Sequence, residues 1–346
     1  MSILYLIFWG SAIIGQIGEQ NIFYWFRTAS GSYLIFGFYY YLQLKQINPA
    51  FLFRLVLYMT IGYMIITILC YIQFPNCWFG IAKWVKDAVY GIISDGANRG
   101  ILRFVLPCKM YIIFWIFYVL SHFKMNMRNL FILFILAVYL LLIGNRFPLF
   151  TCALCSLYMI LFSKNIHLKY KIQLTIFGIL LLSITALIPF TNNIINSLLN
   201  YTYNQYESTG NENIRILSAT YFFTEFNGHD LFHIIAGNGI VTNDHSAYEL
   251  KIAQLQNIGY FSSDVGFCSI YIQFGIIGLL ALALWLAGVL TIKIPKHLNY
   301  IKVFMFFIVL SMIAGGYWFQ DLILIAILTY IMVYSHNKMI IQKKKK

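Results

Sequence analysis

The chain has little charge for its length. Only 10% of its 346 residues are charged, and 61% are hydrophobic. A typical soluble protein carries about 25% charged residues. Such a shortage of water-seeking side chains excludes an ordinary soluble domain and predicts a membrane protein.

Acidic residues are scarcer still, eleven against 24 Lys and Arg, for a net charge of +13. That charge would suit a nucleic-acid partner, but its placement argues against one. Fifteen of the cations lie in five short segments that contain no Asp or Glu: Lys45 and Arg54; Lys124 and Arg128; Lys164, Lys169 and Lys171; Lys293, Lys296 and Lys302; Lys338 and Lys343 to Lys346. Short loops rich in Lys and Arg remain on the cytoplasmic side of a membrane. The basicity therefore predicts topology and no nucleic-acid partner.

Motifs of soluble enzymes are absent. The sequence holds no nucleotide-binding fingerprint, phosphate-binding loop, zinc-ligand spacing or nucleophile elbow. Cys152 and Cys155 form a C-x-x-C, but it lies in an apolar run without a nearby His or acid, so packing is favoured over metal binding. We therefore expect neither a cofactor nor a metal.

Long apolar runs are what the sequence has in abundance. Many reach about 17–25 residues, enough to cross a hydrocarbon core of about 30 Å as helix. A β-barrel would show short alternating segments instead. Ten spans are predicted, near residues 3–18, 22–42, 51–74, 104–121, 129–144, 147–163, 172–190, 266–292, 303–319 and 321–335. The expected fold class is an all-α polytopic membrane bundle of about ten transmembrane helices, one domain over residues 1–346, with both termini cytoplasmic.

Two loops of some size are then expected on the outer side. The smaller covers about 75–103 and the larger about 191–265, which holds seven of the eleven acidic residues. Within the larger loop, apolar residues at helical spacing predict an amphipathic helix over about 212–226. Ser246-x-x-Glu249 predicts the capped start of a second helix, which would stop at Gly259. The large loop is thus predicted to contain short helices.

Arg146 is the sharpest candidate for chemistry. It lies between two predicted spans, two residues before Pro148. A charge near hydrocarbon is costly and often functional, and the planar guanidinium suits phosphate oxygens. The alternative is an Arg that extends to the outer lipid headgroups.

Three further candidates lie in the large loop. Arg215 is either a second anion ligand or a solvated residue paired with an acid of the loop. Asp264, just before the span at 266–292, is a candidate general base, if burial raises its pKa; its ordinary role would be the N-cap of that span, and both roles can hold at once. His245 is a reserve base or an ordinary solvated residue. In the smaller loop, Arg99 and Arg103 either face the membrane site or are interfacial cations.

Three pieces of the sequence, in order, resemble the O-antigen polymerase and O-antigen ligase superfamily of bacterial surface-polysaccharide enzymes. The first is Gly144-Asn145-Arg146 at the outer end of a span. The second is Arg215 followed by Gly237-Asn238-Gly239. The third is Asp264 followed by Gly275-Ile276-Ile277-Gly278. The resemblance covers roughly residues 130–290.

The resemblance implies a glycosyltransferase that joins oligosaccharides carried on undecaprenyl pyrophosphate at the periplasmic face of the bacterial inner membrane. Arg146 and Arg215 would stabilise charge on the leaving pyrophosphate, with Arg99 and Arg103 as helpers. Asp264 would deprotonate the acceptor hydroxyl, with His245 in reserve. The implied partners are undecaprenyl-pyrophosphate-linked oligosaccharides, membrane lipid and a chain-length regulator protein.

Two alternatives stay open. Ligases of the superfamily commonly carry His where this chain has Asp264, so the sequence favours a polymerase over a ligase that moves finished polymer to another acceptor. The other alternative is a transporter or flippase for lipid-linked oligosaccharides. Transporters tend to show repeated halves and polar residues near the bilayer midplane. Neither feature is evident here.

Overall fold

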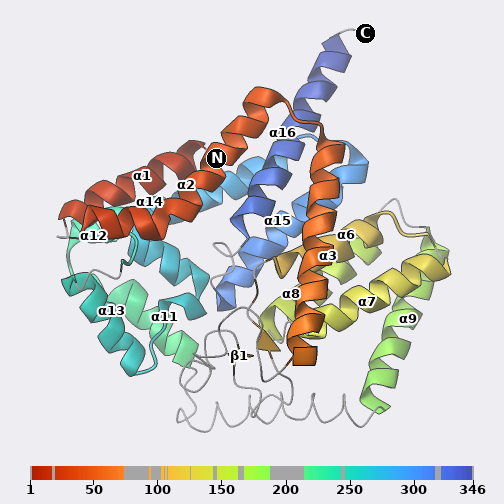
Figure 1. Cartoon of the computed structure of the whole chain (residues 1–346), viewed down its shortest axis with the longest axis horizontal. Helices are drawn as coiled ribbons and strands as arrows, with labels where there is room; N and C mark the ends of the chain where they lie inside the picture. Colours follow the sequence, from red (N-terminus) through yellow and green to blue (C-terminus); the bar gives the residue numbers. More distant parts are fainter. Residues whose placement is uncertain are drawn as a thin grey trace. The chain divides into compact units, whose positions relative to one another are not determined.

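A computed structural model describes residues 2–17, 20–73, 93–94, 103–104, 106, 108–124, 126–142, 146–162, 167–187, 214–242, 246–315 and 321–344. Almost all regular structure in these ranges is helical (Figure 1). The exception is an antiparallel pair of two-residue strands, β1 (Ile93–Ser94) and β2 (Arg103–Phe104). The all-helical fold class is confirmed for this part of the chain.

The chain divides into two compact units. The first comprises Met1–Asn48, Glu212–Leu298 and Met305–Lys346, and the second Pro49–Asn211 and Asn299–Phe304. Helices of the first unit are α1 (Ser2–Ile17), α2 (Ile22–Lys45), α11 (Ile214–Thr224), α12 (Leu231–Ala236), α13 (Ala247–Asn257), η2 (Ser262–Asp264), α14 (Gly266–Thr291), η3 (Lys296–Leu298), η4 (Met312–Ala314) and α16 (Leu322–Lys344). The second unit holds α3 (Pro49–Gln73), α6 (Met110–Ser121), α7 (Met127–Leu142), α8 (Arg146–Phe162) and α9 (Leu168–Leu187), and α15 (Asn299–Ser311) has residues in both.

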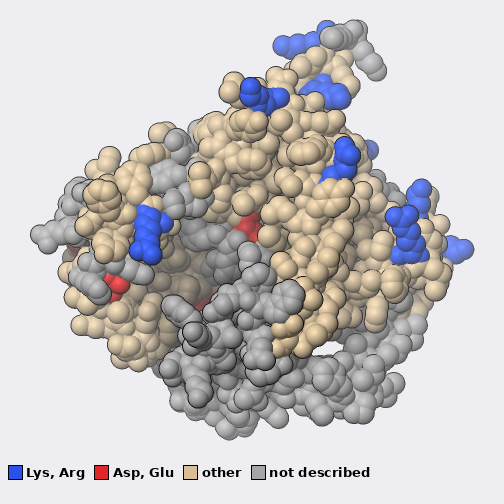
Figure 2. Space-filling view, viewed as in Figure 1, with Lys and Arg blue, Asp and Glu red and all other residues tan. Residues whose placement is uncertain are grey.

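The helices are those of a membrane-embedded protein. Four segments of the described chain are long and apolar enough to span a bilayer: Pro49–Gln73, Gly266–Thr291, Lys296–Ala314 and Leu322–Lys344. Shorter apolar helices cover Met110–Ser121, Met127–Leu142 and Phe147–Phe162. Each of the ten predicted runs overlaps a helix. On the face in Figure 2, most of the described surface is neither acidic nor basic, as expected for surface that meets lipid.

Two helix ends differ from their predicted positions. The run predicted from residue 104 contains helix α6 from Met110, while Phe104 itself pairs as a strand with Ile93. The last predicted span ends near residue 335, whereas the helix that contains it, α16, continues to Lys344. Hydropathy falls there, yet Lys, Met and Gln are good helix formers and no Gly or Pro intervenes.

The core of the second unit is centred on α6, which is buried over most of its surface, as expected of a helix apolar on every side. Phe114 packs against Tyr300 and Phe304, with ring centroids 5.7 and 5.6 Å apart. The indole Nε1 of Trp115 donates to Thr60 Oγ1 at 2.8 Å. Since an unpaired polar group costs several kcal/mol in apolar surroundings, this bond fixes the facing sides of α3 and α6.

Within the first unit, the local predictions for residues 214–258 are confirmed. Helix α11 falls inside the predicted 212–226. Ser246 is the N-cap of α13, and its Oγ accepts from the amide of Glu249 at 3.3 Å. Gly259, with φ +90°, follows the end of that helix. Helix α12 was not predicted, and neither was the interruption of α14 at Gly275.

Candidate functional site

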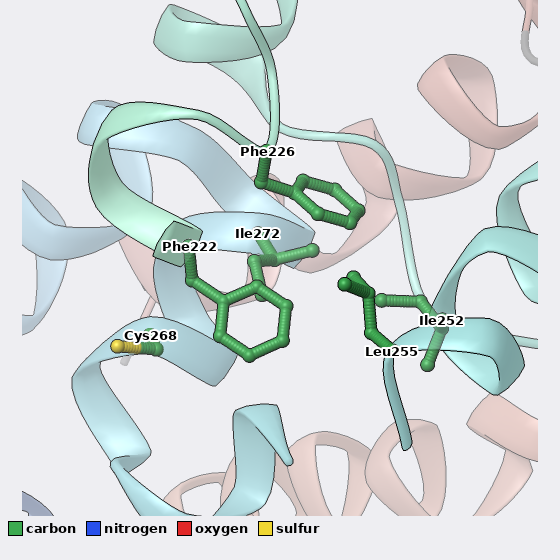
Figure 3. Close-up of a cluster of buried hydrophobic side chains, with 6 residues drawn as sticks. All are labelled: Phe222, Phe226, Ile252, Leu255, Cys268 and Ile272. Carbon is green, nitrogen blue, oxygen red and sulfur yellow. The ribbon is translucent and has the colours of Figure 1, made fainter. Parts of the chain in front are cut away.

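A buried apolar cluster joins three elements of the first unit (Figure 3). It consists of Phe222 of α11, Phe226 just beyond the end of α11, Ile252 and Leu255 of α13, and Cys268 and Ile272 of α14. Spacings of three and four residues put the two α13 residues, and likewise the two α14 residues, on one helix face. The cluster therefore fixes α11 and α13 against the first turns of α14, where the candidate polar residues lie.

Arg215 and Asp264 are close neighbours in this arrangement. Asp264 ends the short helix η2, which packs against both α11 and α14, and Arg215 is the second residue of α11. Burial raises the pKa of Asp264 above its ordinary value, and the charge of Arg215 acts in the opposite direction. Two candidates 49 positions apart in sequence are thus brought within electrostatic reach of each other.

The carboxyl of Asp264 does not cap the following span. Val265 occupies the N-cap position of α14, with no side-chain bond to the helix amides. The N-cap interpretation of Asp264 is therefore wrong. The reason is that η2 places Asp264 one residue too early, so its carboxyl stays half-buried beside Arg215. A partly desolvated carboxylate with a raised pKa is a better general base near neutral pH than a free one.

The two glycine motifs meet at an interruption of α14. Gly275 has φ +62°, outside helical geometry, and divides the helix into residues 266–274 and 276–291. A Cβ at Gly275 would overlap the carbonyl of Ile235, and one at Gly237 would lie 2.5 Å from the backbone of Gln273. Only glycines allow these two backbones to come so close.

Backbone hydrogen bonds seal this junction. In a continuous helix the carbonyls of Ile272 and Gln273 would accept from amides four residues on. Here the amide of Asn238 donates to Ile272 O at 2.8 Å, and that of Gly239 donates to Gln273 O at 3.0 Å. The side-chain Nδ2 of Asn238 also donates to Ile272 O, at 3.0 Å, and to Asn227 Oδ1 at 2.9 Å. Residues 237–239 thus replace the bonds that α14 gives up.

Ser218 is a polar residue of this region that the sequence did not single out. Its side chain is buried, and its hydroxyl has no hydrogen-bond partner among the described residues. It follows Arg215 by three positions, which places both on one face of α11. That spacing was the available signal, but a Ser inside an apolar helix is too common to stand out.

The other candidates lie elsewhere or outside the described residues. Arg146 is the first residue of α8 in the second unit, and Arg103 is in β2 of the same unit; the side chains of both are outside the described part. Arg99 and His245 are outside it altogether. Within the described ranges, no group of three His, Cys, Asp or Glu residues could hold a metal ion.

Comparisons with protein-family models, curated proteins and solved structures found no match to this chain. The family resemblance therefore rests on the residues quoted above.

Proposed function

We propose that the chain is a membrane-embedded glycosyltransferase that polymerises oligosaccharide repeat units carried on undecaprenyl pyrophosphate. The observation that carries the proposal is a half-buried Asp264 just before α14, within electrostatic reach of Arg215. An inverting transfer from a lipid pyrophosphate needs a base for the acceptor and a cation for the leaving group. These two residues offer both.

In the proposed reaction, Asp264 accepts the proton of the acceptor hydroxyl. The hydroxyl oxygen attacks the anomeric carbon from the face opposite the pyrophosphate. The glycosidic bond forms, the bond to the pyrophosphate oxygen breaks, and negative charge grows on the phosphates. Arg215 and Arg146 neutralise that charge, with Arg99 and Arg103 as helpers and His245 as the reserve base. Ser218 is a candidate donor to a phosphate oxygen.

The proposed topology accompanies this chemistry. About ten spans cross the bacterial inner membrane, both termini are cytoplasmic, and the 191–265 and 75–103 segments lie on the periplasmic side. This follows from the five acid-free basic segments, which the positive-inside rule assigns to the cytoplasm. The site then faces the compartment where lipid-linked repeat units are joined. A chain-length regulator protein is a further proposed partner.

The length of the surface glycan, measured in cells that make their polymer only with this protein, tests the proposal. Asp264→Asn and Arg215→Ala are expected to leave single repeat units in place of long polymer, while Glu225→Gln, an exposed acid of the same unit, leaves polymer unchanged. Loss of a ligase would instead leave polymer on its lipid carrier. Long polymer at normal expression of both site variants would refute the glycosyltransferase proposal.

A flippase or transporter is the second candidate, because the interrupted helix α14 is a feature that such proteins use. In transporters the carbonyls freed by the break usually coordinate ions or substrate. Here those of Ile272 and Gln273 accept from the amides of Asn238 and Gly239, which favours a structural break. Transfer of labelled lipid-linked sugar across liposomes without bond formation would favour transport.

A further inference from the structure

The exposed apolar face of α12 is not explained by the proposed function. Leu231, Phe232 and Ile235 have relative exposures of 71%, 45% and 48%. They belong to the 191–265 segment, which the sequence predicts as a loop in water on the outer side of the membrane. Exposure of three large apolar side chains on one short helix is unfavourable in water and marks an interaction surface.

The position of α12 along α14 indicates what covers this face. The backbone of Ile235 contacts Gly275, where α14 is interrupted. The sixteen residues from Ile276 to Thr291 rise about 24 Å as helix, and Lys293 follows them. With Lys293 at one headgroup layer and a hydrocarbon core of about 30 Å, Gly275 lies near the opposite boundary.

Beyond Gly275, α14 carries exposed apolar residues of its own. Ile276, Ile277, Leu280 and Leu284 are exposed at spacings that place them along one side of the helix. A spanning helix turns such a side to lipid. Because the Ile235 backbone adjoins Gly275, the three apolar residues of α12 lie at the outer end of this part of α14.

Polar groups at the start of α12 fit a headgroup position. His229 and Asp230 are exposed, and His233 Nδ1 lies 2.6 Å from Asp230 Oδ2. The neighbouring α13 differs: apart from Ala247, Leu250 and Ala253, its exposed residues are polar, namely Lys251, Gln254, Gln256 and Asn257. A short helix with apolar residues on one side and charged groups at one end is suited to a membrane interface, whereas α13 is suited to water.

We propose that α12 is an interfacial helix that inserts Leu231, Phe232 and Ile235 into the lipid leaflet farther from Lys293. Asp230 and His233 remain among the headgroups, and α13 stays in water. The glycine junction with α14 anchors the helix at this depth. The junction therefore fixes the depth of α12 relative to the bilayer, whatever reaction the Arg215–Asp264 region performs.

Photocrosslinking of the full-length protein in phospholipid vesicles tests this inference. A benzoylphenylalanine replaces Phe232 in one sample and Gln254 of α13 in the other. The expected result is a phospholipid adduct from position 232 and none from position 254. Equal lipid adducts at both positions, an adduct at 232 with another protein only, or no adduct at 232 would overturn the inference.

A second measurement guards against a probe that disturbs folding. Leu231→Cys and Gln254→Cys are treated with a water-soluble maleimide in the same vesicles. The cysteine at 231 is expected to react about tenfold more slowly, because lipid disfavours the reactive thiolate. Both should react fully after denaturation. Equal rates in intact vesicles would mean that residue 231 faces water and would overturn the proposal.

Discussion

Asp264 is the residue on which the chemistry most depends, and its environment makes a signed prediction about stability. Because burial raises its pKa, the folded protein binds a proton more tightly than the unfolded chain. Protonated Asp264 therefore favours the folded state at low pH. Its contribution to the free energy of unfolding falls as pH rises from the ordinary pKa of 3.8 through the higher pKa of the folded protein. Asp264→Asn should equal or exceed the wild type in thermal stability near pH 7. A clear loss of stability would contradict the assignment.

Arg215 should tune the same carboxyl. Its charge lowers the pKa of Asp264, so Arg215→Gln is expected to raise that pKa further. The residual transfer rate of Arg215→Gln should then fall off on the acid side at a higher pH than that of the wild type. Arg215→Lys should shift this fall less because the positive charge is kept. The measurement is the pH profile of polymer formation. If the acid side of the profile of Arg215→Gln does not shift, Arg215 does not act on the carboxyl of Asp264 during the reaction.

The sequence predicted Asp264 and Arg215 as candidate site residues, but it did not predict that they lie close together. Each has an ordinary alternative on local pattern alone, and only the order of the resembling motifs linked them. The N-cap interpretation of Asp264 failed because one residue of register at η2 decides it. Such a shift depends on the packing of η2 against α11 and cannot be predicted from the sequence alone. The pairing of Ser246 with Glu249, which is local chemistry, was predicted correctly.

At the scale of elements, the interruption of α14 should be sensitive to a single methyl group. Gly275→Ala places a Cβ against the Ile235 carbonyl at positive φ. We expect a loss of about 1–3 kcal/mol from backbone strain alone, and more from the overlap. Gly288→Ala, in the same helix with nothing within 4 Å of the added Cβ, should be neutral or gain about 0.5–1 kcal/mol. Thermal unfolding in detergent compares them, and equal unfolding temperatures would contradict the close approach.

Neither this break nor α12 was predicted, for physical reasons. Residues 266–291 are apolar enough to be predicted as one continuous span even though Ser269 and Gln273 lie before Gly275, so hydropathy does not mark the break. A helix of six residues, as α12 is, leaves too short a periodic pattern to identify. Both features exist because residues 237–239 pack against α14, a tertiary contact between positions 34 apart in the sequence. The long apolar helices, whose formation is local, were predicted well.

At the scale of the whole molecule, the topology makes its own prediction. Reporter enzymes that are active only outside the cytoplasm should be active when fused after residue 250 and inactive when fused after Lys344. A reporter active at both positions would mean that the basic C-terminal segment is not cytoplasmic, contrary to the positive-inside argument. The test is independent of catalysis.

The most direct measurement is polymer formation by the purified protein in vesicles supplied with undecaprenyl-pyrophosphate-linked repeat units. The wild type and Glu225→Gln should produce a ladder of lengthening glycans. Asp264→Asn should slow its formation by about a hundredfold or more, as expected for loss of a general base. A wild-type protein that yields no ladder, or an Asp264→Asn variant that yields the full ladder at the wild-type rate, would contradict the account.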